Sequence, residues 1–207
     1  MPDFEIEKSL EGTVIGVDEV GRGPLAGPVV SCACIYKNYE IDKKFIDKID
    51  DSKKISYKNR IKIFKIIQNL KDNKEINYSL GFATVEEIDS HNILEATKLS
   101  MIRAINKLNF KKGNIIFDGK MKLNIKNFIS KDIVKGDNKS ISIATSSIIA
   151  KIHRDRYMRF LSLKFPNYNW EQNAGYGTKR HIDEIYKNGI TDYHRKSFEP
   201  IKTLIHK

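Results

Sequence analysis

The sequence predicts an α/β fold in which a sheet of short apolar strands is flanked by helices, with a small helical lobe near the C-terminus. Three observations support this class. Apolar runs of strand length alternate with longer segments of helical periodicity. Two of the strand-like runs end in acidic residues followed by glycine. The 207 residues suffice for one sizeable core, and no internal repeat or interdomain linker stands out.

The N-terminal part opens with two strand-like runs, residues 13–17 and 28–36, which are expected to form a hairpin or to lie as neighbours. A polar linker over 51–56 leads into a helix, with Ser56 as its predicted N-cap. Residues 76–82 alternate as a third strand. In the helix that follows Ser56, the apolar residues share one face: Ile61, Phe64, Ile67 and Leu70.

Capping signals organise the next segment. Thr84 and Glu87 have capping-box spacing for a short helix, and Asn92 is the predicted cap of a longer one. Two further short strands are expected at 114–117 and 132–134. The inward positions of the longer helix are Ala96, Leu99, Ile102 and Ile105.

The C-terminal third is predicted to be helical. A long helix begins near Ser142 and is stopped by Pro166. A second helix over about 178–188 ends before a glycine. We therefore expect a body over 1–165 and a small helical lobe over 166–207, packed together as one functional domain.

The charge balance is strongly basic. Lys and Arg number 37 against 26 Asp and Glu, a net charge of +11 and a pI near 9.5. Such an excess suits a polyanionic partner, because contacts to phosphates release condensed counterions. The alternative is that the lysine content reflects genome bias and solubility.

Cysteine usage and hydropathy bear on location. Cys32 and Cys34 lie two apart in one strand-like run, without a second ligand pair, so we expect core packing in a reducing compartment. The N-terminus has no signal pattern, and no apolar window approaches the length of a membrane span. These features predict a cytoplasmic protein with no membrane partner.

Four acidic residues lie at strand ends or in glycine-containing loops: Asp18, Glu19, Asp118 and Asp137. If the strands before Asp18 and Asp118 are parallel neighbours, the two aspartates emerge at the same edge of the sheet. Clustered carboxylates repel one another unless a cation neutralises them, and an all-oxygen set favours Mg²⁺ or Mn²⁺. A basic surface with such an acidic site points towards a nuclease. For any single acid, a solvated loop or a helix cap is the alternative.

The chain also resembles a known family. Residues 16–30 read GVDEVGRGPLAGPVV, which is similar to the opening signature of bacterial ribonuclease HII. The resemblance covers nearly the whole chain in the family's order, which makes it far more specific than one short motif. It continues at 51–54, 87–94, 118–119, 135–137, 146–155, 175–178 and 194–198.

The resemblance implies a ribonuclease H-like mixed sheet and an endoribonuclease that cleaves RNA in RNA–DNA hybrids and at single ribonucleotides embedded in duplex DNA. Hydrolysis on the 5′ side of the ribonucleotide would leave a 3′-hydroxyl and a 5′-phosphate. By position, Asp18, Glu19, Asp118 and Asp137 match the family's metal-binding carboxylates, with two Mn²⁺ or Mg²⁺ ions expected when substrate is bound. Asp137 is also a candidate for orienting or deprotonating the attacking water.

The resemblance further assigns substrate contacts. Gly21, Arg22 and Gly23 match the family's contact with the nucleotide that bears the 2′-OH, and Tyr176 matches the tyrosine that packs on the following deoxyribose. Among the remaining motif residues, Lys53, Lys54, Lys151 and Arg195 are suited to contacts with phosphate. Ser146 and Ser147 are candidates for contacts with the substrate backbone. The alternatives are a core tyrosine, solvated basic side chains, and two serines that only let their helix pack closely.

The other motif residues and one departure complete the picture. Arg154 and Asp155 are expected to form separate structural ion pairs, and His153 and His181 to be structural or exposed. Where the family commonly has a basic His-Lys pair, this chain has Asn173 and Ala174, so a phosphate contact is expected to be missing there.

Two rival interpretations stay open. A ribonuclease HIII-type enzyme generally carries an extra N-terminal domain, and only about a dozen residues precede the first strand here. A non-catalytic hybrid-binding module would be expected to lack at least one of the four acids. We expect a monomer that binds RNA–DNA hybrids and ribonucleotide-containing duplex DNA.

Overall fold

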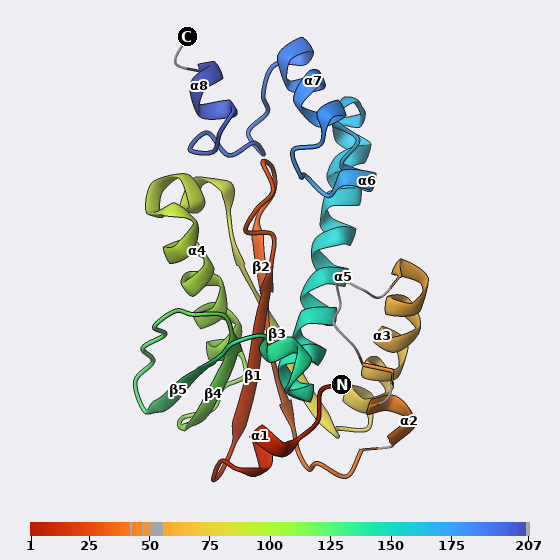
Figure 1. The fold of residues 1–207 in the computed structure, drawn as a ribbon, viewed down its shortest axis with the longest axis vertical. Coiled ribbons are helices and arrows are strands. Elements are labelled where there is room, and N and C mark those ends of the chain that lie inside the picture. The colour runs from red at the N-terminus through yellow and green to blue at the C-terminus, as the bar shows by residue number, and fades with distance from the viewer. Residues whose placement is uncertain (42, 47, 50–55, 206–207) are drawn as a thin grey trace.

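A five-stranded mixed sheet forms the centre of the molecule in the computed structural model, which describes residues 1–41, 43–46, 48–49 and 56–205 (Figure 1). The strand order is β3-β2-β1-β4-β5. β2 is antiparallel to both β1 and β3, whereas β4 runs parallel to β1 and β5 parallel to β4. The strands are β1 Val14–Val20, β2 Val29–Tyr36, β3 Ile76–Ala83, β4 Gly113–Asp118 and β5 Phe128–Ile133.

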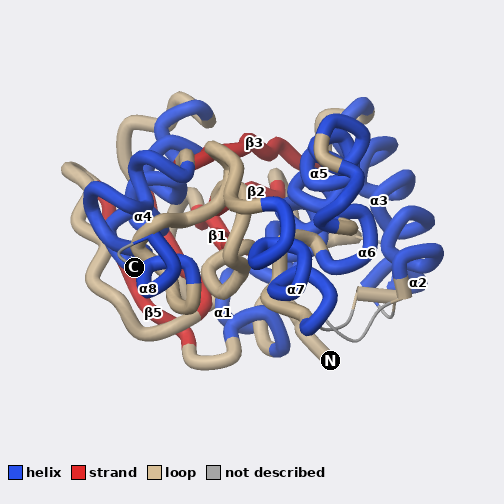
Figure 2. The backbone as a smooth tube through the Cα atoms, turned by 90° about the horizontal axis from the view of Figure 1, so that it is seen from above, coloured by secondary structure: helices blue, strands red, loops and turns tan. Residues whose placement is uncertain are grey.

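Helices cover both faces of the sheet. Figure 2 shows α4 on one side of the strands and α3 with α5 on the other. No helix in the described part of the chain is long and apolar enough to cross a membrane. The helices are α1 Glu5–Lys8, α2 Lys43–Ile46, α3 Tyr57–Asp72, α4 Val85–Lys107, α5 Ile141–Lys164, α6 Trp170–Asn173, α7 Lys179–Asn188 and α8 Ile201–Ile205, with 3-10 turns η1 Gly136–Asn138 and η2 Pro166–Tyr168.

Local capping chemistry fixes the helix boundaries as predicted. Thr84 and Glu87 form a reciprocal capping box at the start of α4. Asn92, with φ 70°, interrupts α4, and its side chain accepts hydrogen bonds from the backbone N–H groups of Leu94 and Glu95. The predicted pair of consecutive helices, the second capped by Asn92, is therefore confirmed. Ser56 likewise caps α3.

Two strands differ from the prediction. β1 continues to Val20 instead of ending at residue 17, because Asp18, Glu19 and Val20 still pair with β2. The carboxylates thus belong to the strand and do not follow it. β5 begins at Phe128, four residues before the predicted start, because it is an edge strand with exposed polar positions that break the apolar pattern.

Hydrophobic clusters lie on both faces of the sheet, and another lies beyond one end of it. Cys32 and Cys34 of β2 are fully buried on the face of the sheet that α3 and α5 cover, and they pack in the core as predicted. The C-terminal lobe gathers around Trp170 beyond the end of the sheet, where it meets the loop between β1 and β2 (Figure 1). Met158 and Leu161 of α5 contribute to that cluster, so the long helix joins the lobe to the body.

Gly81 is the point of closest approach between β3 and α4. A Cβ atom there would collide with the backbone oxygen of Ser100 and lie 2.6 Å from the nitrogen of Ala104. Gly81→Ala should therefore lower the free energy of unfolding by about 1–3 kcal/mol, measured by urea denaturation. Asn77→Ala, at an exposed site of the same strand, is the control and should change stability little. Equal stability of the two variants would contradict the close packing.

Candidate active site

The parallel pairing of β1 with β4 brings the first two acidic motifs together. Val17 pairs with Phe117, so Asp18 and Asp118 lie side by side at the same edge of the sheet. Asp18, Glu19 and Asp118 line one cavity of about 320 Å³. The remaining lining residues are Val20, Arg60, Ser147, Lys151 and Tyr176.

Burial and mutual repulsion perturb these carboxyl groups. Burial raises the pKa of Asp18 well above its ordinary value, with Glu19 and Asp118 adding to the effect, while hydrogen bonds from Ser147 and the Glu19 N–H act in the opposite direction. Burial also raises the pKa of Glu19, opposed by Arg22. The Oε2 atom of Glu19 is buried without a hydrogen-bond partner among the residues described. The cavity therefore concentrates negative charge that the surrounding protein does not fully compensate.

Asp137 lies beside this group but is not a wall of the same cavity. It belongs to η1 and is only 3% exposed, and its Oδ1 accepts a hydrogen bond of 3.2 Å from the Asn138 amide. The preceding residue, Gly136, donates its N–H to Asp118 Oδ1 at 2.8 Å, which anchors η1 at the end of β4. Within the described residues, no set of three or more His, Cys, Asp or Glu side chains is already gathered as a metal site.

The donor chemistry nevertheless fits a hard divalent cation. Asp18, Glu19 and Asp118 offer only carboxylate oxygens to one cavity, and one of these oxygens is buried without a partner among the described residues. Such a cation would relieve both the repulsion and the unsatisfied atom.

The Gly21–Arg22–Gly23 loop forms an adjoining hollow of about 570 Å³. Glu19, Asp118 and Tyr176 line both this hollow and the carboxylate cavity, so the two form one continuous cleft. The other lining residues are Val20, Ile93, Gly119 and Phe198. Tyr176 is 44% exposed, which separates it from an ordinary core tyrosine.

Two cations face the acids across the cavity. Lys151 Nζ lies 2.7 Å from Asp155 Oδ1, and Arg60 NH1 lies 3.7 Å from Asp155 Oδ2. Asp155 thus holds both cations, and its ion pairing confirms the prediction. The pattern of the sequence did not single out Arg60, which looks like any other basic residue on α3.

Several predicted roles change with the positions of the residues. Ser146 is fully buried and donates to the carbonyl of Gly16 at 2.8 Å, so it joins α5 to β1, and its neighbour Ser147 lines the cavity. Arg154 is buried and donates to backbone carbonyls, and no carboxylate of the described residues pairs with it, contrary to expectation. Arg195 is equally buried and is therefore neither solvated nor available to phosphate. Lys53 and Lys54 lie outside the described residues.

Asn173, at a position where the resemblance implies a basic residue, has a structural role. It is 9% exposed, its amide donates to the carbonyl of Tyr168, and its Oδ1 accepts from the N–H of Gly175, both at 2.8 Å. The Asn173 side chain therefore fixes, through these two hydrogen bonds, the turn that positions Tyr176.

Two buried histidines also support this turn. Trp170 Nε1 donates to His181 Nε2 at 3.0 Å, so that nitrogen is an acceptor, and His194 Nε2, 3.1 Å away, must donate to it. His181 Nδ1 then donates to the carbonyl of Tyr176 at 2.8 Å. Both rings are thus neutral, and His194 accepts at Nδ1 from Thr191. The prediction that His181 is structural is confirmed.

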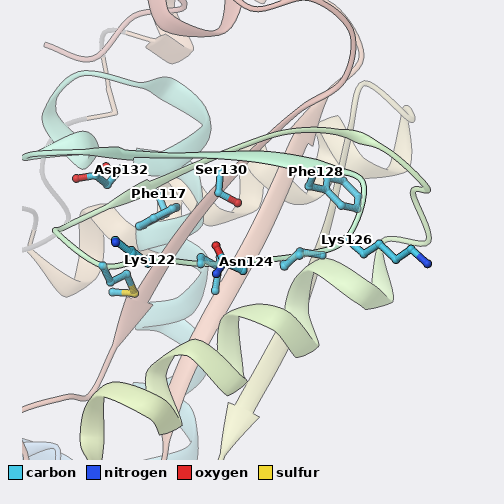
Figure 3. Close-up of a pocket in the computed structure, with 10 residues that line it drawn as sticks. Phe117, Lys122, Asn124, Lys126, Phe128, Ser130 and Asp132 are labelled. Atoms are coloured by element: carbon cyan, nitrogen blue, oxygen red, sulfur yellow. The ribbon is translucent and has the colours of Figure 1, made fainter.

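A further hollow of about 400 Å³ lies over β4 and β5, away from the acids (Figure 3). The segment between these strands covers it, and the labelled Lys122, Asn124 and Lys126 lie along that segment opposite Phe117 and Ser130. None of the four predicted acids lines it. We therefore place the candidate active site in the cleft between the carboxylates and the Gly21–Gly23 loop.

Comparisons with known proteins agree with this fold. Ribonuclease H2 from Pyrococcus horikoshii superposes with a TM-score of 0.76 at 24% identity, covering 94% of this chain and 98% of that one. The structure of Bst-RNase HIII in complex with Mn²⁺ gives a TM-score of 0.67 at 17% identity, over 100% of this chain and 73% of that one. The fold is therefore that of the type 2 ribonucleases H.

Sequence comparison narrows this class. A model of the family Ribonuclease HII matches residues 15–201. Ribonuclease HII of Wolbachia pipientis subsp. Culex pipiens is 48% identical over 203 residues, which cover 98% of each chain. The chain belongs to the ribonuclease HII family and is a ribonuclease H hydrolase. This assignment favours type HII over the type HIII alternative.

The contrast between Ser146 and Ser147 can be tested directly. Ser146→Ala removes a buried hydrogen bond and should lower the free energy of unfolding by about 1 kcal/mol, without slowing nuclease activity per folded molecule. Ser147→Ala alters the cavity beside Asp18 and should slow nuclease activity per folded molecule. Activity assays and thermal melts check both variants. Slow cleavage by Ser146→Ala would contradict the purely structural role and indicate that Ser146 contacts the substrate.

The buried histidines predict an acid-sensitive lobe. Burial, aided by His181, lowers the pKa of His194 to about 3, whereas an unfolded histidine titrates near 6.5. Because the unfolded chain binds the proton first, the stabilisation is complete above about pH 6.5. It falls as the pH decreases towards 3, by up to about 1.4 kcal/mol per pH unit.

Urea unfolding between pH 7 and pH 5 measures this slope. His194→Gln should flatten it relative to the parent, whereas the exposed His91→Gln should not. The raised pKa values of Asp18 and Glu19 contribute with the opposite sign but are common to all three proteins. Identical slopes in the parent and His194→Gln would contradict the prediction.

Proposed function

We propose that this protein cleaves the RNA strand of RNA–DNA hybrids and single ribonucleotides embedded in duplex DNA, on the 5′ side of the ribonucleotide, leaving a 3′-hydroxyl and a 5′-phosphate. One observation carries the proposal. The carboxylate cavity and the Gly21–Gly23 hollow share the wall formed by Glu19, Asp118 and Tyr176. The phosphate to be hydrolysed is next to the ribose to be recognised, so the metal site and the sugar-binding site have to adjoin each other.

Asp18, Glu19 and Asp118 are the proposed holders of Mn²⁺ or Mg²⁺, with two ions when substrate is bound. Such ions supply Lewis acidity and neutralise charge that develops during phosphodiester hydrolysis. The raised pKa of Asp18 and the partnerless Oε2 of Glu19 support this role. The structure of Bst-RNase HIII in complex with Mn²⁺, which has a similar fold, also supports a metal-binding role. Asp137 is the proposed fourth ligand, adjacent to the Gly136 that anchors Asp118.

The substrate contacts follow from what each wall of the cleft offers. Backbone groups of Gly21, Arg22 and Gly23 are proposed to contact the ribonucleotide, and the exposed ring of Tyr176 to pack on the next deoxyribose. Lys151 and Arg60, held by Asp155, face the acids and suit a phosphate. These contacts orient the scissile phosphate, while the buried walls restrict water at the cavity floor. The protein is proposed to act as a cytoplasmic monomer.

Cleavage of a duplex with one ribonucleotide, in Mn²⁺, tests the proposal. Asp118→Asn should slow cleavage by on the order of 100-fold or more, because it removes a charge from the carboxylate set, while duplex binding persists. Asp132→Asn is the matched control, because Asp132 carries the same charge on the neighbouring strand and is exposed outside the cleft. It should cleave like the parent.

The other outcomes are equally informative. Equal cleavage by Asp118→Asn and the parent would remove Asp118 from the site. Tight binding by the parent without metal-dependent cleavage would favour the non-catalytic hybrid-binding module.

A further inference from the structure

Arg195 is a buried charge whose partners lie in the loop proposed to read the ribose. Its side chain is fully buried. The guanidinium donates to the carbonyl of Arg22 at 2.8 Å, to that of Gly27 at 2.8 and 3.1 Å, and to that of Gly21. Among the described residues, no carboxylate forms a hydrogen bond with it. Carbonyl dipoles of one short loop therefore satisfy this charge, which makes the loop and the arginine mutually dependent.

These bonds fix the direction of two peptide groups. The peptides that join residues 21, 22 and 23 are trans, so each N–H points opposite to the carbonyl of the preceding residue. Because the Gly21 and Arg22 carbonyls point inwards to Arg195, the N–H groups of Arg22 and Gly23 point the other way. Neither N–H has a hydrogen-bond partner within the described chain. Both residues line the open hollow beside the carboxylates.

Further hydrogen bonds hold the segment around Arg195 in place. The backbone N–H of Arg195 donates to the carbonyl of Leu25, and the N–H of Gly27 to that of Tyr193, both at 2.8 Å. Asp89 of α4 accepts from the N–H groups of Lys196 and Ser197 at 2.9 Å each. The segment around Arg195 is thus tied to the loop on one side and to α4 on the other.

We infer that Arg195 is a positioning residue for sugar recognition: it holds the peptide planes of residues 21–23 so that two N–H donors face a 2′-hydroxyl oxygen in the cleft. The inference deepens the proposed function and rests on it. Arg195 does not touch the substrate. The sugar is read by backbone donors, and the exposed Arg22 side chain is not needed for this reading.

The ratio of affinities for two duplexes tests the role of Arg195. The Asp118→Asn protein serves as a non-cleaving background, and binding is measured to a duplex with one ribonucleotide and to its all-deoxy counterpart. Adding Arg195→Lys should reduce the preference for the ribonucleotide about tenfold, towards unity, with affinity for the all-deoxy duplex retained. A merely structural defect would weaken binding to both duplexes equally.

Arg154→Lys is the matched control. Arg154 is as buried as Arg195, but its carbonyl partners are Ala26, Pro28 and Ala174, outside residues 21–23. It should keep the ribonucleotide preference even where overall affinity falls. An unchanged preference in Arg195→Lys would overturn the inference while leaving the proposed function intact. A background protein with no preference at all would overturn both.

Hydrogen exchange provides a second test that does not depend on the folding of the variant. In the Asp118→Asn protein, the ribonucleotide duplex should slow exchange of the Arg22 and Gly23 amides at least tenfold more than the all-deoxy duplex does. Equal exchange with both duplexes would overturn the inference even where Arg195→Lys fails to fold.

Discussion

The parallel pairing of β1 with β4 is the constraint on which the site depends. It places Asp18 and Asp118 at one edge of the sheet although several helices and two further strands, β2 and β3, separate them in the chain. The pairing also buries like charges together, which raises the pKa of Asp18. A fold that forces carboxylates into one cavity accepts an electrostatic penalty, which a bound divalent cation would relieve.

The second half of the cleft depends on buried arginines in place of buried acids. Arg154 and Arg195 lie beneath the loop between β1 and β2 and bind its carbonyls. Gly21 has φ 98°, and a Cβ there would collide with the Arg154 guanidinium, so only glycine lets the loop lie so close. Carbonyls turned towards a buried cation leave N–H groups turned towards the cleft. One short loop thus joins a negative cavity to a surface of donors.

Local signals predicted the parts of the fold that local chemistry decides. The caps at Thr84 and Asn92 involve residues only two or three positions apart, so the sequence carries them in full. The sequence offered both Ser146 and Ser147 as candidates for substrate contact, but it did not show which of the two faces the cleft. Residues 141–150 of α5 are all buried, so no polar face indicated its orientation. Arg195 resembled a solvated loop residue because its carbonyl partners lie more than 160 positions away.

Asn173 and Ala174, which stand where the resemblance to the family implies a basic pair, hold the backbone in place without carrying charge. Asn173 holds the Tyr176 turn with neutral hydrogen bonds, and the Ala174 carbonyl receives Arg154. Tyr176 therefore keeps its place at the shared wall of the cleft without basic side chains at these two positions. In the proposed function, Lys151 and Arg60, which line the cavity, take the phosphate contact that the resemblance assigns to a basic pair. Under the proposed function, the turn sets where Tyr176 meets the duplex, and the surrounding positive charge supplies the affinity for phosphate.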